Sequence, residues 1–364
     1  MKKLLLFLLL TLVLSTGIVQ GASEAAPIEY EKGVVVFVGP LDQSMQKQYQ
    51  MVKGELVSIQ LTSGPEAGKV VDTFNFVSER SVYEIKVKQG DKVIVAVTRD
   101  LGKTSYHVSD FDRFDYVYIL GGLFILLLIV FGGFIGAKSV MVIGFSMFLI
   151  FKFFVGQVLA NQYSLTLLTL LVAAAIAVAT QVVVCGLSKK TLAAVLGTIG
   201  GVVVAGILSV LSIKFMHLTG LDSEEAMLLK AFTLSHINFQ DVLFAGMVFG
   251  ALGAVMDVTI SIASAVYEVK CVQPAIGFKE LVRAGMNVGR DIMGTMSNTL
   301  ILAYAGSSLP LMLLIASQDN VSMLRIANLN MIVTEFARAF TGSIGLICAI
   351  PLTAVITAIL LKND

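Results

Sequence analysis

Charged and hydroxyl side chains recur on one face of a long apolar segment in the last third of the chain. Gly246–Val269 is long enough to cross a bilayer as a helix, which takes about 20 mostly apolar residues. An ionisable group near the centre of such a helix costs about 2.5–3.5 kcal/mol to insert, so Asp257 is a candidate functional residue. Steps of three and four place the polar and small residues on one stripe. The stripe consists of Gly246, Gly250, Gly253, Asp257, Ser261, Ser264 and Glu268.

A second apolar segment, Asp291–Leu314, follows after a basic connector and carries a similar stripe. This stripe consists of Asn287, Asp291, Gly294, Asn298, Ile301, Ala305 and Ser308. If the two segments form an antiparallel hairpin, we expect one polar seam, with Arg290 beside Asp291 at its edge. The Gly285–Arg290 stretch is expected to be a loop or a broken helix start, and Pro310 to kink the second helix. The expected seam contains Asp257, Ser261, Ser264, Glu268, Asp291 and Asn298.

The same residues also have structural interpretations, which the sequence leaves open. Asn298 suits a hydrogen bond between helices, and Glu268 and Asp291 suit interfacial charges or a helix cap. For Asp257 two roles compete: ion binding in a transport path, or a static pair with a basic or hydroxyl group, for which Arg290 is one candidate. Small residues allow helices to approach closely. The expected packing residues are Gly246, Gly250, Gly253 and Gly294.

The composition indicates a membrane protein. Of the 364 residues, 56% are hydrophobic and 14% are charged, whereas soluble domains average about 45–50% apolar and about 25% charged residues. The net charge of +1 says nothing about nucleic acid, but no basic stripe with interleaved aromatic residues is present, so no nucleic-acid partner is expected. The three cysteines and three histidines show no redox or metal-ligand spacing, and no phosphate-binding loop is present. No cofactor is expected, and the sequence leaves metal binding open.

The N-terminal part predicts an exported all-β domain. Residues 1–21 have the charged start, apolar stretch and small-residue exit of a signal sequence, either cleaved near Gly21 or kept as an anchor. Residues 22–114 contain short β-branched runs between turn-forming residues, which favours an OB-like barrel or a sandwich. The expected strands are Val34–Val38, Glu55–Leu61, Lys69–Phe76, Val82–Val87 and Lys92–Thr98.

Residues 115–364 predict an α-helical polytopic membrane bundle of about seven spans. Basic residues gather at alternate ends of these spans, so the positive-inside rule places the β-domain outside and the C-terminus in the cytoplasm. We therefore expect a multi-pass protein of the bacterial cytoplasmic membrane. Two intervening segments, Asp222–Gln240 and Asp319–Phe340, are expected to be interfacial or re-entrant helices. The expected spans are Val117–Ile135, Val140–Leu159, Leu165–Leu187, Leu192–Ile213, Val242–Val266, Ile292–Ala316 and Thr341–Leu361.

The hairpin region resembles a known family. GALGAVMDVTISIASAVYEV and GMNVGRDIMGTMSNTLILAYAGSSLPLMLL, both within Gly246–Leu314, are similar to the YibE/F-like multispanning membrane proteins of bacteria. The order of signal sequence, β-rich domain and membrane bundle also resembles that family. The resemblance implies a transporter or permease-like protein and supplies no substrate or catalytic residue. The role of Asp257 therefore rests on its position in this chain.

Two functions from different classes fit the sequence. The first is a secondary transporter or channel-like permease, coupled to a proton or cation through Asp257, with Ser261, Ser264 and Asn298 as neutral oxygen groups. Its partners would be the lipid bilayer and an ion or small solute, and the glycine faces would suit a homo-oligomer. The second is a membrane-anchored assembly protein whose β-domain binds an envelope partner. An intramembrane enzyme is disfavoured, because an HExxH motif and a paired aspartate motif are absent.

Overall fold

The computed structural model of the chain describes most of its length. The described residues divide into two compact units, one ending at Leu127 and the other beginning at Leu128. The expected signal sequence, residues 1–21, lies outside them. The described ranges are 28–40, 54–76, 85–100, 103–161, 163–234, 236–317 and 322–362.

The N-terminal unit contains a five-stranded antiparallel sheet that curves into a half-barrel, with strand order β3-β2-β1-β4-β5. Alternate valines and isoleucines point to the concave side, where Val57, Ile59 and Val93 are fully buried. The edge strands β3 and β5 approach each other, and the Thr73 hydroxyl donates a 2.5 Å hydrogen bond to the Tyr106 carbonyl. The strands are β1 (Glu29–Pro40), β2 (Gly54–Leu61), β3 (Val70–Phe76), β4 (Lys92–Asp100) and β5 (Lys103–Phe111).

Four of the five expected strands are confirmed as β1 to β4, but the strand expected at Val82–Val87 is not. Residues up to 84 of that segment lie outside the described part, and residues 85–88 are not in a strand. The remaining strand is β5, whose sequence KTSYHVSDF is mostly polar. It lies at the sheet edge and pairs with β4, so its side chains need not be apolar on both faces.

An ion pair ties the half-barrel to the start of helix α3 (Phe114–Phe148). The Lys32 ammonium lies 2.8 Å from the nearly buried carboxylate of Asp112, and the Phe114 N–H at the start of α3 also donates to that carboxylate. The hydrogen bond from Lys32 is the main cause that lowers the pKa of Asp112. The ionised carboxylate therefore stabilises this unit above about pH 4, and that contribution is lost as pH falls through the lowered pKa.

The rest of the described chain is helical. Five helical stretches are long and apolar enough to cross a membrane, and the bent pair α9–α10 makes six if it counts as one span. These helices indicate a multi-pass membrane protein. The elements are α3 (Phe114–Phe148), η1 (Leu149–Phe154), α4 (Val155–Ala160), α5 (Leu165–Cys185), α6 (Lys189–Phe215), α7 (Glu224–Leu228), η2 (Leu229–Thr233), α8 (Phe239–Val272), α9 (Phe278–Ser307), α10 (Leu309–Ala316), α11 (Met323–Ala327) and α12 (Asn330–Leu360).

The first two of the seven expected spans lie in one helical stretch. Phe114–Ala160 is 47 residues long, but its backbone leaves the helical conformation at Gly133, where φ is 54° and ψ is −131°. Beyond this point the chain folds back sharply and brings Gly136 so close to the Leu128 carbonyl that a Cβ on Gly136 would collide with it. A glycine adopts this positive φ without the steric penalty of a side chain.

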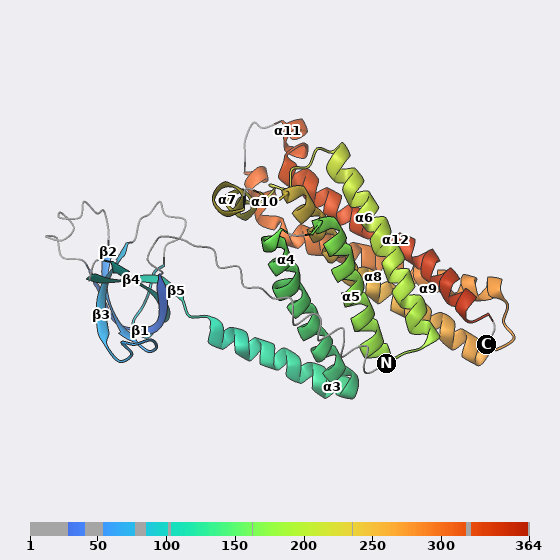
Figure 1. The fold of residues 1–364 in the computed structure, drawn as a ribbon, viewed down its shortest axis with the longest axis horizontal. Helices are drawn as coiled ribbons and strands as arrows, with labels where there is room; N and C mark the ends of the chain where they lie inside the picture. Colours follow the sequence, from blue (N-terminus) through green and yellow to red (C-terminus); the bar gives the residue numbers. More distant parts are fainter. Residues whose placement is uncertain are drawn as a thin grey trace. The chain divides into compact units, whose positions relative to one another are not determined.

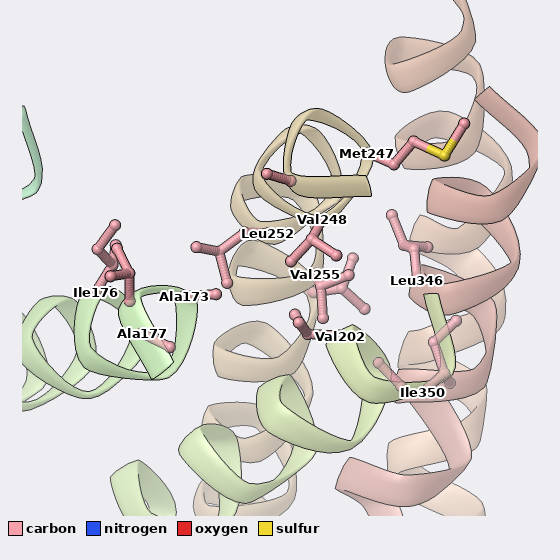
Figure 2. Packing of buried hydrophobic residues seen from close by; sticks show 14 of the residues in the cluster. Ala173, Ile176, Ala177, Val202, Met247, Val248, Leu252, Val255, Leu346 and Ile350 are labelled. Carbon is pink, nitrogen blue, oxygen red and sulfur yellow. The ribbon is translucent and has the colours of Figure 1, made fainter. Parts of the chain in front are cut away.

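Helix α8 forms the centre of the helical unit, in contact with α5, α6, α9 and α12. Figure 1 shows α5 and α6 running alongside each other, with α8, α9 and α12 behind them. In Figure 2, Val255 of α8 lies between Val202 of α6 and Ile350 of α12. Val248, Val255 and Val258 of α8 are all fully buried. The apolar face of α8 therefore faces other helices of the same chain.

Small residues allow α6 and α12 to approach closely. A Cβ on Gly345 of α12 would lie 2.6 Å from the Ala205 Cβ and 2.9 Å from the Gly201 carbonyl oxygen, both on α6. A Cβ on Gly201 would in turn lie 2.7 Å from the Ala349 Cβ. Real side chains essentially never come so close, so this crossing requires glycine.

Polar side chains in the bundle core are hydrogen-bonded across three helices. Gln181 of α5 donates through Nε2 to the Thr198 hydroxyl of α6 at 2.7 Å, and Thr198 lies 2.7 Å from the Thr259 hydroxyl of α8. All three side chains are at most 3% exposed. A hydrogen-bonded group avoids the free-energy cost of an unpaired polar group in an apolar interior.

Several expectations for the regions around the hairpin need correction. Residues Gly285–Arg290 are not a loop or helix start, because α9 begins at Phe278 and continues through them. The expected kink at Pro310 is confirmed, since α9 ends at Ser307 and α10 follows at an angle of 61°. The second intervening segment includes α11, but α12 already begins at Asn330.

Candidate functional site

Helices α8 and α9 form the expected antiparallel hairpin. A five-residue connector, 273–277, joins them, and Lys270 folds back to donate a 2.7 Å hydrogen bond to the Pro274 carbonyl. A Cβ on Gly289 would lie against Ile262, and a Cβ on Gly250 would collide with the Tyr304 hydroxyl. The residue numbers thus fall along α8 as they rise along α9, as an antiparallel pair requires.

Asp257 lies near the midpoint of the 34-residue α8, on the face directed away from the core. Its neighbours Val255 and Val258 are fully buried, whereas Asp257 itself is exposed in the single chain. Within the described residues, no hydrogen bond or ion pair reaches its carboxylate. The Ser261 hydroxyl donates instead to the Asp257 backbone carbonyl, at 2.7 Å. The carboxylate is therefore free to bind something from outside the hairpin.

The other polar stripe residues of α8 share this open face. Ser261 and Glu268 are exposed, and Ser264 is partly exposed. Among the described residues, neither Glu268 nor Arg290 has an ion-pair partner. The static pair between Asp257 and Arg290 that the sequence left open is thus not formed here.

The polar residues of α9 do not join Asp257 in one seam. Asn298 and Asp291 are exposed. Asn298 is two residues from Leu300 and Asp291 is two residues from Gly289, and both Leu300 and Gly289 pack against neighbouring helices. At about 100° per residue, each therefore points about 160° away from that packed neighbour. Helical spacing alone identifies a stripe but does not say which stripe faces the partner helix.

The stripe glycines differ from one another in their surroundings. Gly250 packs closely against Tyr304, as the packing interpretation predicts. A Cβ on Gly246, Gly253 or Gly294 would meet no atom of the described chain within 4 Å. Gly253, one helical turn from Asp257, therefore leaves open space beside it, whereas Gly246 and Gly294 leave open space elsewhere along α8 and α9.

Two hydroxyl groups of α9 were missed in the sequence. The Ser297 Oγ and the Tyr304 hydroxyl are buried, and neither has a hydrogen-bond partner within the described part of the chain. Both lie on the side of α9 that includes Leu300, three and four residues away. The sequence could have indicated these two hydroxyls by their spacing from the apolar Leu300. They do not lie on the most polar stripe of the helix, which is where candidate residues were sought.

A charged cluster lies near the start of α12. Arg338 lies 3.3 Å from Glu335 and 3.4 Å from Asp222, which precedes α7. In the sequence Glu335 and Arg338 were assigned to a separate interfacial helix, but the structure places them in the spanning helix itself. The cluster joins the α6–α7 loop to helix α12.

The described residues contain no group of three or more histidine, cysteine, aspartate or glutamate side chains that could hold a metal ion. The three cysteines are free thiols: Cys271 is exposed, and Cys185 and Cys348 are partly buried.

The fold and this hairpin define a multi-pass helical membrane protein that carries a separate β half-barrel unit. The family model described as YibE/F-like protein matches residues 120–363, most of the chain and nearly all of its helical part. The chain belongs to the YibE/F-like family. Comparison with curated proteins and with solved structures gives no match.

Proposed function

We propose that the protein is a secondary transporter or channel-like permease of the bacterial cytoplasmic membrane. An ion or small solute would pass along the open face of the α8–α9 hairpin, with Asp257 as the ion-binding group. The observation that carries the proposal is the unpartnered carboxylate of Asp257 near the midpoint of a membrane-length helix. A carboxylate in contact with lipid there would cost several kcal/mol, so water, an ion or another protein surface must meet it.

The surroundings of Asp257 support ion binding. Gly253 and Ser261, on the same face, are small and leave room beside the carboxylate. Ser261 and Ser264 of the same helix offer neutral hydroxyl oxygens on the same stripe. Hard cations prefer oxygen ligands of this kind, and a proton would need only the carboxylate. A second copy of the chain, packed over this face, would enclose the path and form a homo-oligomer.

The break between α9 and α10 also supports a transport role. Ser308, between the two helices, is buried, and the 61° bend interrupts the backbone hydrogen bonds of a membrane-length segment. Such breaks are tolerated at membrane depth where the backbone faces protein or a water-filled cavity, and transporters use them around their binding sites.

The proposed topology has seven spans, an OB-like β-domain outside and the C-terminus in the cytoplasm. The 47-residue stretch Phe114–Ala160 would extend about 70 Å as a straight helix, more than twice the roughly 30 Å of the hydrocarbon core. The fold-back at Gly133 supports its division into two spans. The closing contact between β3 and β5 supports the OB-like assignment.

Ion flux into proteoliposomes tests the proposal. We expect wild-type protein to show ion flux under an imposed proton or sodium gradient. Asp257→Asn is expected to reduce this flux by about tenfold or more, because the amide keeps the shape of the side chain but removes its charge. Glu224→Gln, at the start of α7, removes a carboxylate outside the spanning helices and serves as the control. Wild-type flux and gradient dependence in folded Asp257→Asn would contradict the proposed role.

A second function, a membrane-anchored assembly protein, is favoured by one observation. The β unit has its own hydrophobic core and exposes large apolar side chains such as Tyr30, Phe37 and Val70. These side chains could bind an envelope partner. If the β unit fused to an unrelated membrane anchor retained function in cells, this second function would replace the first.

A further inference from the structure

A polar cup lies where the ends of three helices meet, away from the hairpin face that holds Asp257. Its cavity of about 330 Å³ is bounded by the first turns of α5 and α8 and by the last turn of α6. Lys214 and His217 line it from α6 and the turn after it, and Gln240 and Asp241 line it from α8. The cup thus combines a cation, an imidazole, a carboxylate and an amide in one small space.

Hydrogen bonds hold the carboxylate side of the cup in place. Asp241 accepts one bond from the Thr166 hydroxyl of α5 and one from the Asn238 side-chain amide, both at 3.2 Å. Gln240 donates through Nε2 to the Leu218 carbonyl at 2.7 Å, which ties α8 to the turn after α6. The three helix ends are therefore joined by side chains that also line the cavity.

The turn after α6 fixes His217. The residue has φ of 51°, and the Leu218 N–H donates a 3.0 Å hydrogen bond back to the Ile213 carbonyl, as in a Schellman motif. Leu218 is 1% exposed, so its burial holds the turn. Among the described residues, neither Lys214 nor His217 has an ion-pair partner, so both can contact an anionic group in the cup.

An apolar trough continues from the cup. It has a volume of about 250 Å³ and shares Thr166, Val210 and Phe244 with the polar cavity, so the two adjoin. Its side walls are Leu170 of α5 and an aliphatic row of α6. Steps of three and four place Lys214 on the same face of α6 as that row, at its end. The α6 part of the trough consists of Val203, Gly206, Ile207, Val210 and Leu211.

We propose that this groove binds a phospholipid with a zwitterionic headgroup that carries a primary ammonium, of the phosphatidylethanolamine type. One acyl chain occupies the trough, the phosphate contacts Lys214 and His217, and the ammonium contacts Asp241. The opposite charges within one cup match such a headgroup. An anionic headgroup without an ammonium would leave Asp241 unpaired next to a negative charge. A water-soluble solute with the same headgroup would leave the trough empty. The site is independent of the proposed transport path.

Gly206 provides a matched pair of variants for the trough. A Cβ there would lie 3.5 Å from the Phe244 ring and 3.8 Å from Leu170, which is ordinary van der Waals contact. Gly206→Ala is therefore expected to fold and bind lipid like wild type, whereas Gly206→Leu directs a large side chain into the trough. Both variants keep all polar groups of the cup.

Lipid binding to the full-length protein in detergent tests the proposal, with native mass spectrometry and titration of short-chain lipids as the readouts. Phosphatidylethanolamine is expected to bind. Lys214→Ala is expected to weaken this binding by about tenfold or more, the size of a lost charge-assisted contact, and Gly206→Leu by a similar factor because it fills the trough. Asp241→Asn, which keeps an acceptor for Thr166, is expected to remove the preference for phosphatidylethanolamine over phosphatidylglycerol.

Three results would overturn the proposal, provided that gel filtration and thermal unfolding show folded protein. One is binding of phosphatidylethanolamine to Gly206→Leu as tightly as to Gly206→Ala. Another is tighter binding of phosphatidylglycerol than of phosphatidylethanolamine by the wild type. The third is equal affinity for glycerophosphoethanolamine, which has no acyl chains and would identify a soluble solute as the ligand.

Discussion

The two faces of α8 differ in what surrounds them. On one face, Val248, Val255 and Val258 are fully buried against neighbouring helices. On the other, Gly253 and Asp257 are exposed in the single chain, and a Cβ on Gly253 would meet no described atom within 4 Å. One helix therefore holds the bundle together with its apolar side and presents a carboxylate with its small-residue side.

This difference shows that small residues in a spanning helix have more than one use. On α6 and α12, Gly201 and Gly345 are required because the backbones come too close for any side chain. On α8, Gly246 and Gly253 face open space instead, and Gly253 lies one helical turn from Asp257. The two uses give different expectations for substitution, and these expectations test the comparison.

The largest effect on stability is expected where glycines allow α6 and α12 to pack closely. Gly345→Ala places a Cβ 2.6 Å from Ala205, so helices α6 and α12 must move apart. We expect a loss of about 1–3 kcal/mol, the usual cost of overpacking. Thermal unfolding in detergent measures it, with Gly246→Ala as the control, expected to change stability by no more than about 0.5 kcal/mol. Equal losses of stability in the two variants would remove the distinction between glycines required for close packing and glycines that face open space.

A comparable or somewhat smaller effect is expected in the core hydrogen bonds. Thr198→Val keeps the shape of the side chain but leaves Gln181 and Thr259 without their shared partner. An unsatisfied buried polar group costs about 1–3 kcal/mol. Thr299→Val is the matched control, because Thr299 is exposed and bonds only to the carbonyl of Thr295 on its own helix. Full stability of Thr198→Val would show that the network contributes little.

The smallest effect on stability is expected at Asp257. Since its carboxylate has no partner among the described residues, Asp257→Asn should change the free energy of unfolding by about 0.5 kcal/mol or less. Unfolding in the same detergent checks this. A large loss of stability would mean that Asp257 has a structural partner, in a second copy for example, and would weaken its assignment to a transport path.

Much of the fold was predictable from the sequence because the signals are local. Apolar runs of membrane length located α5, α6 and α8, and alternating valines located β1 and β4. Strand β5 was missed because an edge strand with a polar sequence has little hydrophobic pattern. The start of α9 was missed because Gly285 and Gly289 look like breaks, whereas they allow close contact with Ala354 and Ile350.

The candidate site was less predictable, because it depends on how the helices are rotated against each other. Periodicity placed the α8 stripe on one face correctly but could not show that this face is open. It likewise selected Asn298 rather than Ser297 and Tyr304, since residues on neighbouring faces differ by a rotation that only tertiary packing sets. The Arg338 cluster joins residues more than 100 positions apart, beyond the reach of any local pattern.

The exposed thiol of Cys271 can report on which side of the membrane the α8–α9 connector lies. Cys271 is exposed at the connector end of α8, whereas Cys185 and Cys348 are partly shielded within their helices. A membrane-impermeant maleimide can react with Cys271 only from the side of the membrane on which the connector lies. Labelling in inside-out vesicles but not in intact spheroplasts would place the connector in the cytoplasm, on the native protein and without an engineered cysteine.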